Sequence, residues 1–318
     1  MGREELQTIR LRHRVEAAGL GGLLRLLRVL PAPARYALAG RVGQWIRFID
    51  RRHARIAHAS LALRYGEAGA KGKVREVFRE LGHLAGEIPL LETLSPEGLQ
   101  AMVGSVEGRE HLEAAAGDPR GVLLLSVHAG NWELLGQILP QYGLNPLRGV
   151  YRPLDNPILE ERLRACRARH GIEPIDRRHA SRQVMSALRR GDTVAMLMDQ
   201  HLRNSARIEL PFLGETARVP TTLARFARKA GCPILPAFLV REAPERFRLV
   251  ALPPIEPGEF GEDEAGIRDL TAATVAAMEA GIALAPAQWF WVHRRWRGEP
   301  RELLPGTSIP RWSGSVRP

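Results

Sequence analysis

The feature that most constrains the fold is an alternation, from residue 121 onward, of short apolar runs with longer stretches of helical periodicity. The first run, GVLLLSV at 121–127, has the length and composition of a strand that is buried on both faces. Most of the runs are separated by a predicted helix, and this order favours a mostly parallel sheet with helices on its faces. We therefore predict an α/β fold with a central, mostly parallel sheet flanked by helices. Further strands are expected at 147–153, 172–176, 193–199, 233–240 and 246–255.

The first part of the chain is helical by its periodicity, with helices predicted at 34–66 and 73–92. Before them, the apolar segment 19–33 is interrupted by Arg25 and Arg28 and ended by prolines, so it is too short and too charged to span a bilayer. As a helix it places leucines on one face and arginines on another, which fits a helix lying in a membrane surface and equally a helix packed on the domain. The start of the chain lacks the apolar core and cleavage site of a signal peptide.

These patterns divide the chain into three expected parts. Residues 1–92 form an N-terminal helical region that associates with membranes, and residues 93–298 form the α/β domain. The remaining 299–318, rich in proline, glycine and serine, form a flexible tail.

Charge and missing motifs limit the functions to consider. The 318 residues carry a net charge of +11, mostly from arginine, which favours phosphates, anionic lipids or an acidic protein partner unless it reflects compositional drift alone. Cys166 and Cys232 lack the spacing of a metal cluster or a redox pair, and the scattered histidines contain no HExxH. No P-loop, GxGxxG after a strand, GxSxG or nucleic-acid-binding motif is present, so we expect no metal, no nucleotide cofactor and no nucleic-acid partner.

A cluster of polar residues follows the first strand. The segment SVHAGNWELLG at 126–136 places His128 five residues before Glu133, at the C-terminal end of a strand, where open α/β sheets hold their ligands. A carboxylate about one helical turn away can accept a hydrogen bond from the imidazole, and the opposite nitrogen can then take a proton from a substrate hydroxyl. Backbone amides after Gly130 are the expected donors to an oxyanion. A capped helix without a catalytic role remains the alternative, because short motifs of this kind also arise by chance.

Four blocks of sequence, in order, resemble the late acyltransferases of bacterial lipid A biosynthesis, which belong to the lysophospholipid-acyltransferase-like superfamily. The blocks cover roughly 121–297 and read HAGNWELLG, VYRPLDNPILEERLRACRARHG, MLMDQHLRNSARIELPFLGETARVPTTLARFARKAGCPILP and APAQWFWVHRRWR. The chain departs from the family pattern at Ala129, where an aromatic residue is usual, and at His201, where an acidic residue is common.

The resemblance implies O-acyl transfer without a cofactor. The donor would be an acyl thioester on acyl carrier protein or coenzyme A, and the acceptor a hydroxyl of a membrane lipid or glycolipid such as a lipid A precursor. His128 and Glu133 would form the catalytic dyad. The family's location implies the cytoplasmic face of the bacterial inner membrane, with peripheral or monotopic attachment.

Further residues are expected to bind the substrate. Arg152 fits a phosphate or glycolipid head group, or an ion pair with Asp155, and only one of Arg167 and Arg169 is expected to face the site. Asp199 ends a buried strand, where an unpaired carboxylate is costly, so it should orient an arginine or a substrate group, or cap a helix. The remaining expected substrate-binding residues are Asn131, Gln200 and Arg294.

The closing string QWFWVHRRWR combines tryptophans with arginines. Its tryptophans suit an interfacial aromatic belt, and Arg294 and Arg295 suit lipid phosphates. A buried C-terminal strand is the alternative. Together with residues 19–30, this string predicts attachment to a membrane surface.

Overall fold

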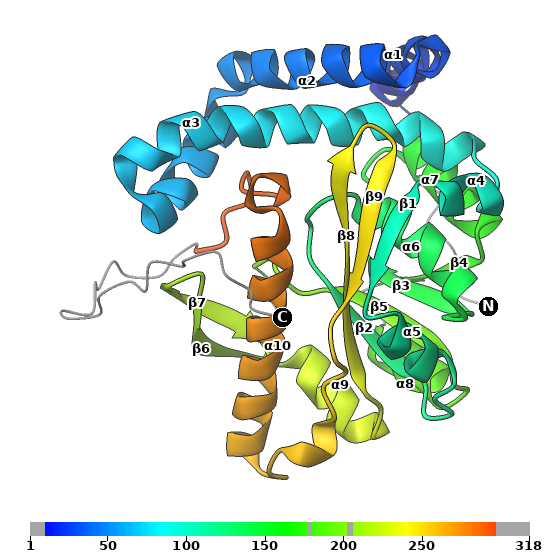
Figure 1. Cartoon of the computed structure of the whole chain (residues 1–318), viewed down its shortest axis with the longest axis vertical. Coiled ribbons are helices and arrows are strands. Elements are labelled where there is room, and N and C mark those ends of the chain that lie inside the picture. Colours follow the sequence, from blue (N-terminus) through cyan, green and yellow to red (C-terminus); the bar gives the residue numbers. More distant parts are fainter. Residues whose placement is uncertain (1–9, 177–179, 202–205, 297–318) are drawn as a thin grey trace.

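A computed structural model of the chain describes residues 10–176, 180–201 and 206–296, so the tail expected at 299–318 lies outside the described residues. Its centre is a seven-stranded sheet of order β1-β9-β8-β2-β5-β3-β4 (Figure 1). The strands are β1 (Val103–Glu107), β2 (Val122–Ser126), β3 (Leu147–Tyr151), β4 (Ile172–Asp176), β5 (Thr193–Leu197), β8 (Ile234–Ala243) and β9 (Arg246–Ala251). Strands β8, β2, β5, β3 and β4 are parallel, whereas β9 is antiparallel to β8 and parallel to β1. The prediction of a mostly parallel central sheet is confirmed.

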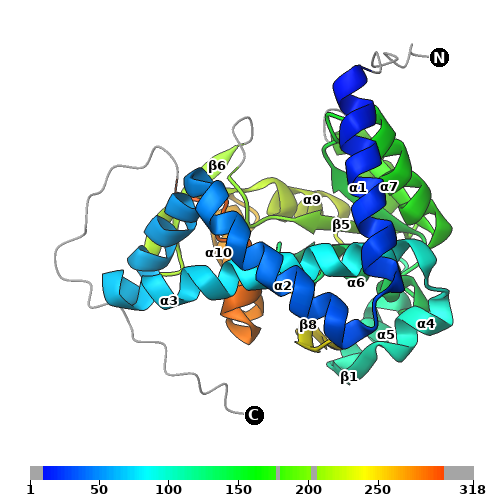
Figure 2. The same cartoon turned by 90° about the horizontal axis from the view of Figure 1, so that it is seen from above.

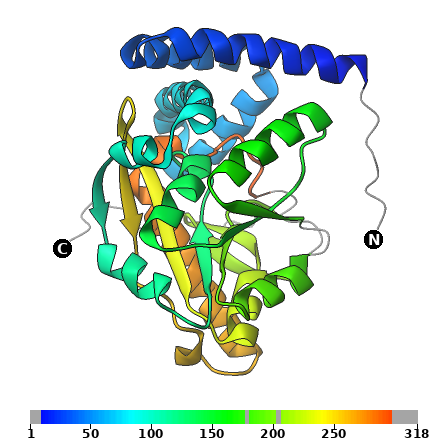
Figure 3. The ribbon, with the colours of Figure 1, turned by 90° about the vertical axis from the view of Figure 1, so that its right-hand side faces the viewer.

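Helices cover both faces of this sheet (Figure 3). All five residues of β2 are buried, with Leu123 and Leu125 in one hydrophobic core and Val122 and Leu124 in the core on the opposite face. This alternation follows from the two-residue period of a strand, so the continuous apolar run requires two covering layers. The helices of these layers are α4 (Pro96–Ala101), α5 (Arg109–Ala116), α6 (Trp132–Ile138), α7 (Pro157–Arg169), α8 (Ala180–Leu188), α9 (Thr222–Ala230) and α10 (Glu264–Leu284).

Two helix ends that the sequence predicts are confirmed. The Asn156 side chain accepts hydrogen bonds from the backbone N–H groups of Ile158 and Leu159, and Pro157 occupies the first turn of α7. Gly231 ends α9 with φ of 65°, in the left-handed region that favours glycine.

Besides the short helices α4 and α5, three features were not predicted. Strand β1 is one, and the antiparallel hairpin of β6 (Arg207–Phe212) and β7 (Glu215–Pro220) is another. The third is a break at Asp50 in the helix expected at 34–66, which separates α2 (Ala32–Ile49) from α3 (Arg51–Thr93). The Asp50 carboxylate accepts a hydrogen bond from the backbone N–H of His53, so it caps a new helix at this point. Helix α3 then continues through a kink at Gly66 into the helix expected at 73–92.

Helices α1 (Leu11–Val29) and α2 form a layer over α3 on one side of the sheet (Figures 1 and 2). The crossing of α2 and α3 is close, because a Cβ on Gly43 would lie 2.2 Å from the Phe78 carbonyl oxygen and one on Gly82 would lie 2.1 Å from the Ala39 carbonyl oxygen. Phe78 belongs to the same core as Leu123, so the helical region shares its core with the sheet. None of the helices in the described ranges combines the length and apolar character needed to cross a bilayer.

Candidate active site

The site is centred on His128 and Asp199, which follow two neighbouring strands. Strands β2 and β5 pair in parallel with Ser126 opposite Leu197, and each functional residue stands two positions beyond this pair. The two side chains therefore emerge side by side at the carboxyl edge of the sheet. The His128 Nδ1 lies 2.8 Å from the Asp199 Oδ1, and the backbone N–H of His128 donates to Oδ2 at 3.1 Å.

Asp199 is almost fully buried, with 1% of its surface exposed, and the Trp289 indole N–H also donates to its Oδ2, at 2.7 Å. Burial raises the pKa of this carboxyl, but the charge and hydrogen bonds of His128 and the bond from Trp289 outweigh it and hold the pKa below its ordinary value. The ionised Asp199 accepts the Nδ1 proton, which leaves the His128 Nε2 with a free lone pair. In the part of the chain that the structure describes, this Nε2 has no hydrogen-bond partner.

The pairing expected from the sequence was therefore wrong: the carboxylate on His128 is Asp199, not Glu133. The Glu133 carboxylate receives both donors of the Arg167 guanidinium, Nη2 at 2.6 Å and Nε at 3.1 Å. Burial lowers the pKa of Arg167, but Glu133 raises it above its ordinary value, so the pair stays charged. Glu133 lies in the first turn of α6 and points toward α7. The partner of His128 is Asp199, because the parallel pairing of β2 with β5 places the two residues side by side. Asp199 in turn holds the catalytic candidate rather than an arginine or a substrate group.

Aromatic rings enclose the imidazole. The Trp132 and Phe290 ring centroids lie 5.1 Å and 6.3 Å from that of His128, and the Phe290 backbone N–H donates to the His128 carbonyl oxygen at 2.9 Å. The His128 side chain nevertheless remains 22% exposed. A reacting group can therefore reach the imidazole, while the apolar rings limit the water around it.

Asn131, expected to bind substrate, is fully buried with both ends of its side chain in use. Its Oδ1 accepts the Leu134 backbone N–H at 2.9 Å and caps α6, and its Nδ2 donates to the Glu87 Oε2 at 2.8 Å. Each end of the amide thus has a partner within the protein, and Asn131 fixes the turn between His128 and α6. A substrate-binding role for Asn131 stays a prediction.

The Glu87 carboxylate on α3 is the centre of a buried polar network. Besides Asn131 it accepts hydrogen bonds from the Arg241 guanidinium and, at 2.8 Å, from the Tyr36 hydroxyl of α2. Burial, followed by the charge of Glu87, raises the pKa of Tyr36, so the hydroxyl stays protonated and donates. Arg241 also donates to Glu80 at 2.7 Å. A single buried carboxylate thus connects α2, α3 and β8 to the turn that carries His128.

Two backbone amides of the turn that follows His128 already have acceptors. The Gly130 N–H donates to the Gln288 carbonyl oxygen at 3.3 Å, and the Asn131 N–H donates to the Leu239 carbonyl oxygen at the same distance. These two bonds hold the turn against the rest of the domain. Neither of these two N–H groups is available to an oxyanion, and stabilisation by other amides at the start of the helix after Gly130 stays a prediction.

The remaining expected substrate residues lie in different surroundings. Arg152 is exposed and pairs with Asp155 at 2.8 Å, which is the surface ion pair that the sequence left as an alternative. Arg169 is exposed and donates to the carbonyl oxygen of Glu92 at the end of α3, so of the two candidates on α7 it is Arg167 that faces Glu133. Gln200 directly follows Asp199 and is half-buried. A substrate role for Arg152 and Gln200 stays a prediction.

The closing aromatic string packs inside the domain rather than on a membrane. Trp289 and Trp291 are 3% and 1% exposed, with ring centroids 4.6 Å apart. Arg295 is fully buried, donates to the Arg218 carbonyl oxygen at 3.1 Å and lies over the Phe212 ring. An interfacial belt at this position was therefore a wrong expectation, whereas Arg294 is exposed.

The described residues contain no group of three or more His, Cys, Asp or Glu side chains that could hold a metal ion. The arrangement at His128 is instead that of a general base whose tautomer is set by a buried carboxylate. A hydroxyl bound against Nε2 is the group that it can activate. The sequence signal for this pair was the position of both residues directly after predicted strands.

Comparison with known proteins identifies the family of the chain. The sequence profile described as bacterial lipid A biosynthesis acyltransferase matches residues 7–298. The chain is 30% identical over 289 residues to a lipid A biosynthesis lauroyltransferase of Escherichia coli (strain K12), and 29% identical over 290 residues to a palmitoleoyltransferase of the same pathway and strain. Both alignments cover 88% of this chain and 90% of the relative. A phosphatidylinositol mannoside acyltransferase of Mycobacterium tuberculosis is 25% identical over 232 residues, covering 72% of this chain and 68% of that protein.

Proposed function

Because the chain belongs to the bacterial lipid A biosynthesis acyltransferase family and is an acyltransferase, we propose that it moves a fatty acyl chain from an acyl thioester to a hydroxyl of a membrane glycolipid such as a lipid A precursor. The observation that carries this proposal is the His128 Nε2, left free by the bond between Nδ1 and the buried Asp199. A related acyltransferase named for a phosphatidylinositol mannoside supports a glycolipid as the general class of acceptor.

The proposed reaction needs no covalent enzyme intermediate. The His128 Nε2 takes the proton of the acceptor hydroxyl while the hydroxyl oxygen attacks the carbonyl carbon of the thioester. The tetrahedral intermediate then collapses, the carbon–sulfur bond breaks, and the imidazolium returns the proton to the leaving thiolate. Asp199 stabilises the imidazolium formed between these steps and keeps its ring in position, as the carboxylate does in a Ser-His-Asp triad.

Glu133 enters this mechanism through Arg167 rather than through the imidazole. Its carboxylate holds the guanidinium by two hydrogen bonds, and the Arg167 Cζ lies 4.7 Å from the centroid of the Tyr151 ring. An arginine fixed in this way positions polar groups of an acceptor against the carboxyl edge of the sheet. We therefore assign Glu133 and Arg167 to acceptor positioning, in place of the dyad role expected for Glu133.

We propose acyl carrier protein or coenzyme A as the carrier of the acyl group. Both are anionic, and the net charge of +11 favours their approach. Donor competition assays with the two thioesters would separate these carriers.

Attachment to a membrane surface is proposed on the exposed side chains of α1 and α2. Apart from Leu154, the exposed large apolar side chains of the described residues all belong to these two helices. They are Leu11, Val15, Leu23, Leu26, Val29, Leu38, Val42, Trp45, Ile46, Phe48 and Ile49. Exposed arginines lie between them, as in helices that lie in the plane of an interface. Binding to anionic vesicles should weaken as salt rises, and retention reversed only by detergent would contradict peripheral attachment.

The test of the proposed reaction is the variant His128→Ala. General-base catalysis is worth about 10²–10⁴-fold, so acyl transfer from a thioester to a lipid A precursor should fall by that order. Thermal melting and vesicle binding should stay near wild type, because the side chain is partly exposed and lies outside both cores. Near-wild-type turnover in His128→Ala would overturn the mechanism.

A further inference from the structure

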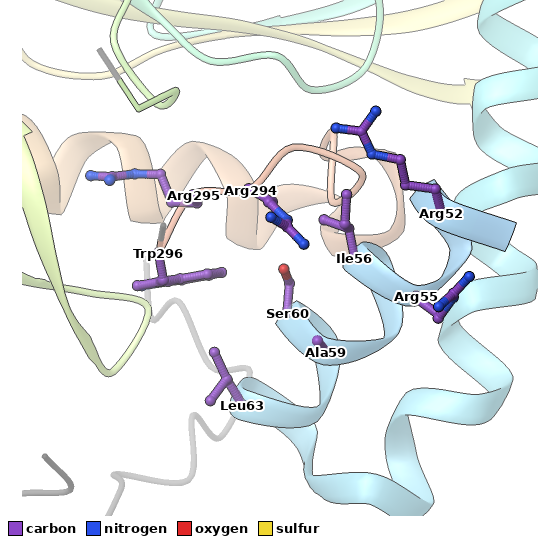
Figure 4. Close-up of a pocket in the computed structure, with 9 residues that line it drawn as sticks. All are labelled: Arg52, Arg55, Ile56, Ala59, Ser60, Leu63, Arg294, Arg295 and Trp296. Carbon is purple, nitrogen blue, oxygen red and sulfur yellow. The ribbon is translucent and has the colours of Figure 1, made fainter. Parts of the chain in front are cut away.

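A second candidate site lies between the first half of α3 and the C-terminal segment, apart from His128 (Figure 4). It is a cavity of about 460 Å³, a volume suited to part of a small ligand. Its walls come from one face of α3 and from the segment that follows the buried tryptophans. The lining residues are Arg52, Arg55, Ile56, Ala59, Ser60, Leu63, Arg294, Arg295 and Trp296.

The cavity is cationic at its rim. Arg52, Arg55 and Arg294 are exposed, and among the described residues that line the cavity there is no carboxylate. Within the described ranges, neither Arg52 nor Arg294 forms an ion pair, whereas Arg55 donates through Nε to the Arg51 carbonyl oxygen. The Asp50 carboxylate lies two residues before Arg52 and interacts with its charge, so it offsets part of the positive charge at the rim. An anion between the guanidinium groups would remove the remaining repulsion.

The inner wall is apolar except for one hydroxyl. Ile56 and Ser60 are buried, Leu63 and Trp296 are half-buried, and Figure 4 shows the Ser60 oxygen and the Arg294 guanidinium directed into the same space. A small inorganic anion would satisfy the rim and leave the apolar wall uncovered. An anion that carries an apolar body satisfies both.

The cavity also lies next to the apolar face of α2. Phe48 and Ile49, exposed by 60% and 82%, precede Arg52 by only four and three residues across the cap at Asp50. If the apolar face of α2 lies against a membrane as proposed above, Arg52 and Arg55 follow directly where the chain leaves that face, close to lipid head groups. This adjacency favours a lipid over a soluble anion as the occupant.

We propose that this cavity binds the phosphate group of an amphiphilic lipid, with Arg52, Arg55 and Arg294 on the phosphate and Ile56, Leu63 and Trp296 against its apolar part. The proposal rests on the proposed function, because it gives the acceptor class a phosphate. The cavity is tied to the catalytic pair through the backbone, since Phe290 bonds to His128 and Arg294 follows four residues later. Phosphate binding would thereby set the position of the acceptor along the sheet edge.

The test is equilibrium binding by calorimetry with dihexanoyl phosphatidate, a short-chain phosphate monoester that stays monomeric. The full chain, the single variants Arg52→Ala and Arg294→Ala, and the control Arg75→Ala are compared. Arg75 is an exposed arginine on α3 outside the cavity, so it removes the same charge elsewhere. Each cavity variant should raise Kd by about tenfold or more, Arg294→Lys should restore part of the loss, and the control should change Kd less than about twofold. All variants should keep the melting temperature of the wild type.

Three results would overturn the proposal. They are an unchanged Kd in both cavity variants, equal affinity for dihexanoylglycerol, which lacks the phosphate, and equal affinity for inorganic phosphate, which lacks the chains. Tighter binding of 4′-phosphopantetheine than of phosphatidate would assign the cavity to the acyl carrier instead and would also contradict it. Repeating the titration on His128→Ala separates the two proposals, because phosphatidate binding there does not depend on acyl transfer.

Discussion

Replacing Asp199 by asparagine is the most informative single perturbation of the site, because it keeps the shape of the side chain and changes only its hydrogen bonding. In the wild type, two donors converge on Oδ2, the backbone N–H of His128 and the indole N–H of Trp289. Oδ1 accepts the proton of the imidazole Nδ1. An asparagine has one oxygen and one NH₂ group, so it cannot accept at both positions.

The amide oxygen should take the position of Oδ2. The opposite orientation would point the NH₂ group at two buried donors and leave both unsatisfied, at about 1–3 kcal/mol each. The NH₂ group then faces Nδ1, which must accept, and the imidazole proton moves to Nε2, where it blocks the base. Recovering the active tautomer requires the amide flip, so turnover should fall by about 30-fold to 10⁴-fold. The same substitution in Ser-His-Asp triads costs about 10⁴-fold.

The assay is the initial rate of acyl transfer from an acyl thioester to a lipid A precursor in detergent, with melting temperature measured in parallel. Asp155→Asn is the matched control, because it makes the same chemical change on an exposed carboxylate. It should retain wild-type turnover. Turnover of Asp199→Asn within about threefold of wild type, with the fold intact, would refute the assignment of Asp199 as the residue that sets the tautomer.

Acid unfolding gives a second check on Asp199. Its pKa is lower in the fold than in the unfolded chain, so its ionisation stabilises the protein fully above the unfolded value of about 3.9. This contribution is lost as pH falls through the lower, folded pKa. The difference in unfolding free energy between wild type and Asp199→Asn should therefore be constant near neutrality and shrink below about pH 4. A difference that grows on acidification would contradict the ionised state of the carboxyl.

The other predictions concern acceptor positioning, membrane contact and helix packing. Glu133→Gln and Arg167→Met should each lower turnover and melting temperature. The double variant should lose little more than either single variant, because the two side chains act as one ion pair. Additive losses would show that the two side chains act independently. Trp45→Ser should weaken binding to anionic vesicles about tenfold or more without changing the melting temperature, because this ring is 72% exposed. Unchanged sedimentation with vesicles would rule out this face of α2 as the membrane-binding surface. Gly43→Ala should destabilise the protein by about 1–3 kcal/mol in denaturant unfolding, because its Cβ would lie 2.2 Å from a carbonyl oxygen of α3. The control Gly19→Ala should leave the stability unchanged, because no atom lies within 4 Å of its Cβ. Equal stability of the two variants would contradict the close crossing of α2 and α3.

The sequence predicted the central sheet and the residue at its edge because these depend on local patterns. A continuous apolar run followed by His128 is readable along the chain, and so is the run that ends at Asp199. That the two residues lie side by side cannot be predicted from the sequence, because it depends on β2 pairing with β5 rather than with β3, the next strand along the chain. Proximity in sequence therefore favoured Glu133, which the structure places on Arg167.

The polar network and the closing string show a second limit. In the sequence, Glu87 reads as one more polar position of a long helix, because its main partner Arg241 lies 154 residues away. The tryptophans near the end of the chain read as interfacial since composition does not distinguish an aromatic belt from an aromatic core. Trp289 is buried because its N–H has an acceptor in Asp199, a contact that exists only once the sheet has formed.

The carboxylate of Glu87 also has a consequence for protein engineering. The layer of α1 and α2 carries nearly all of the exposed large apolar side chains of the described residues, so it is the obvious part to delete in order to reduce apolar surface. Tyr36, however, belongs to that layer and supplies one of the donors to Glu87, and α2 helps to keep this carboxylate from water. A shortened chain would hydrate the group that anchors Asn131 and, through it, the turn of His128. Deleting these helices would therefore cost turnover, whereas substitutions on the outer face of α2 reduce the exposed apolar surface and leave the contact between Tyr36 and Glu87 in place.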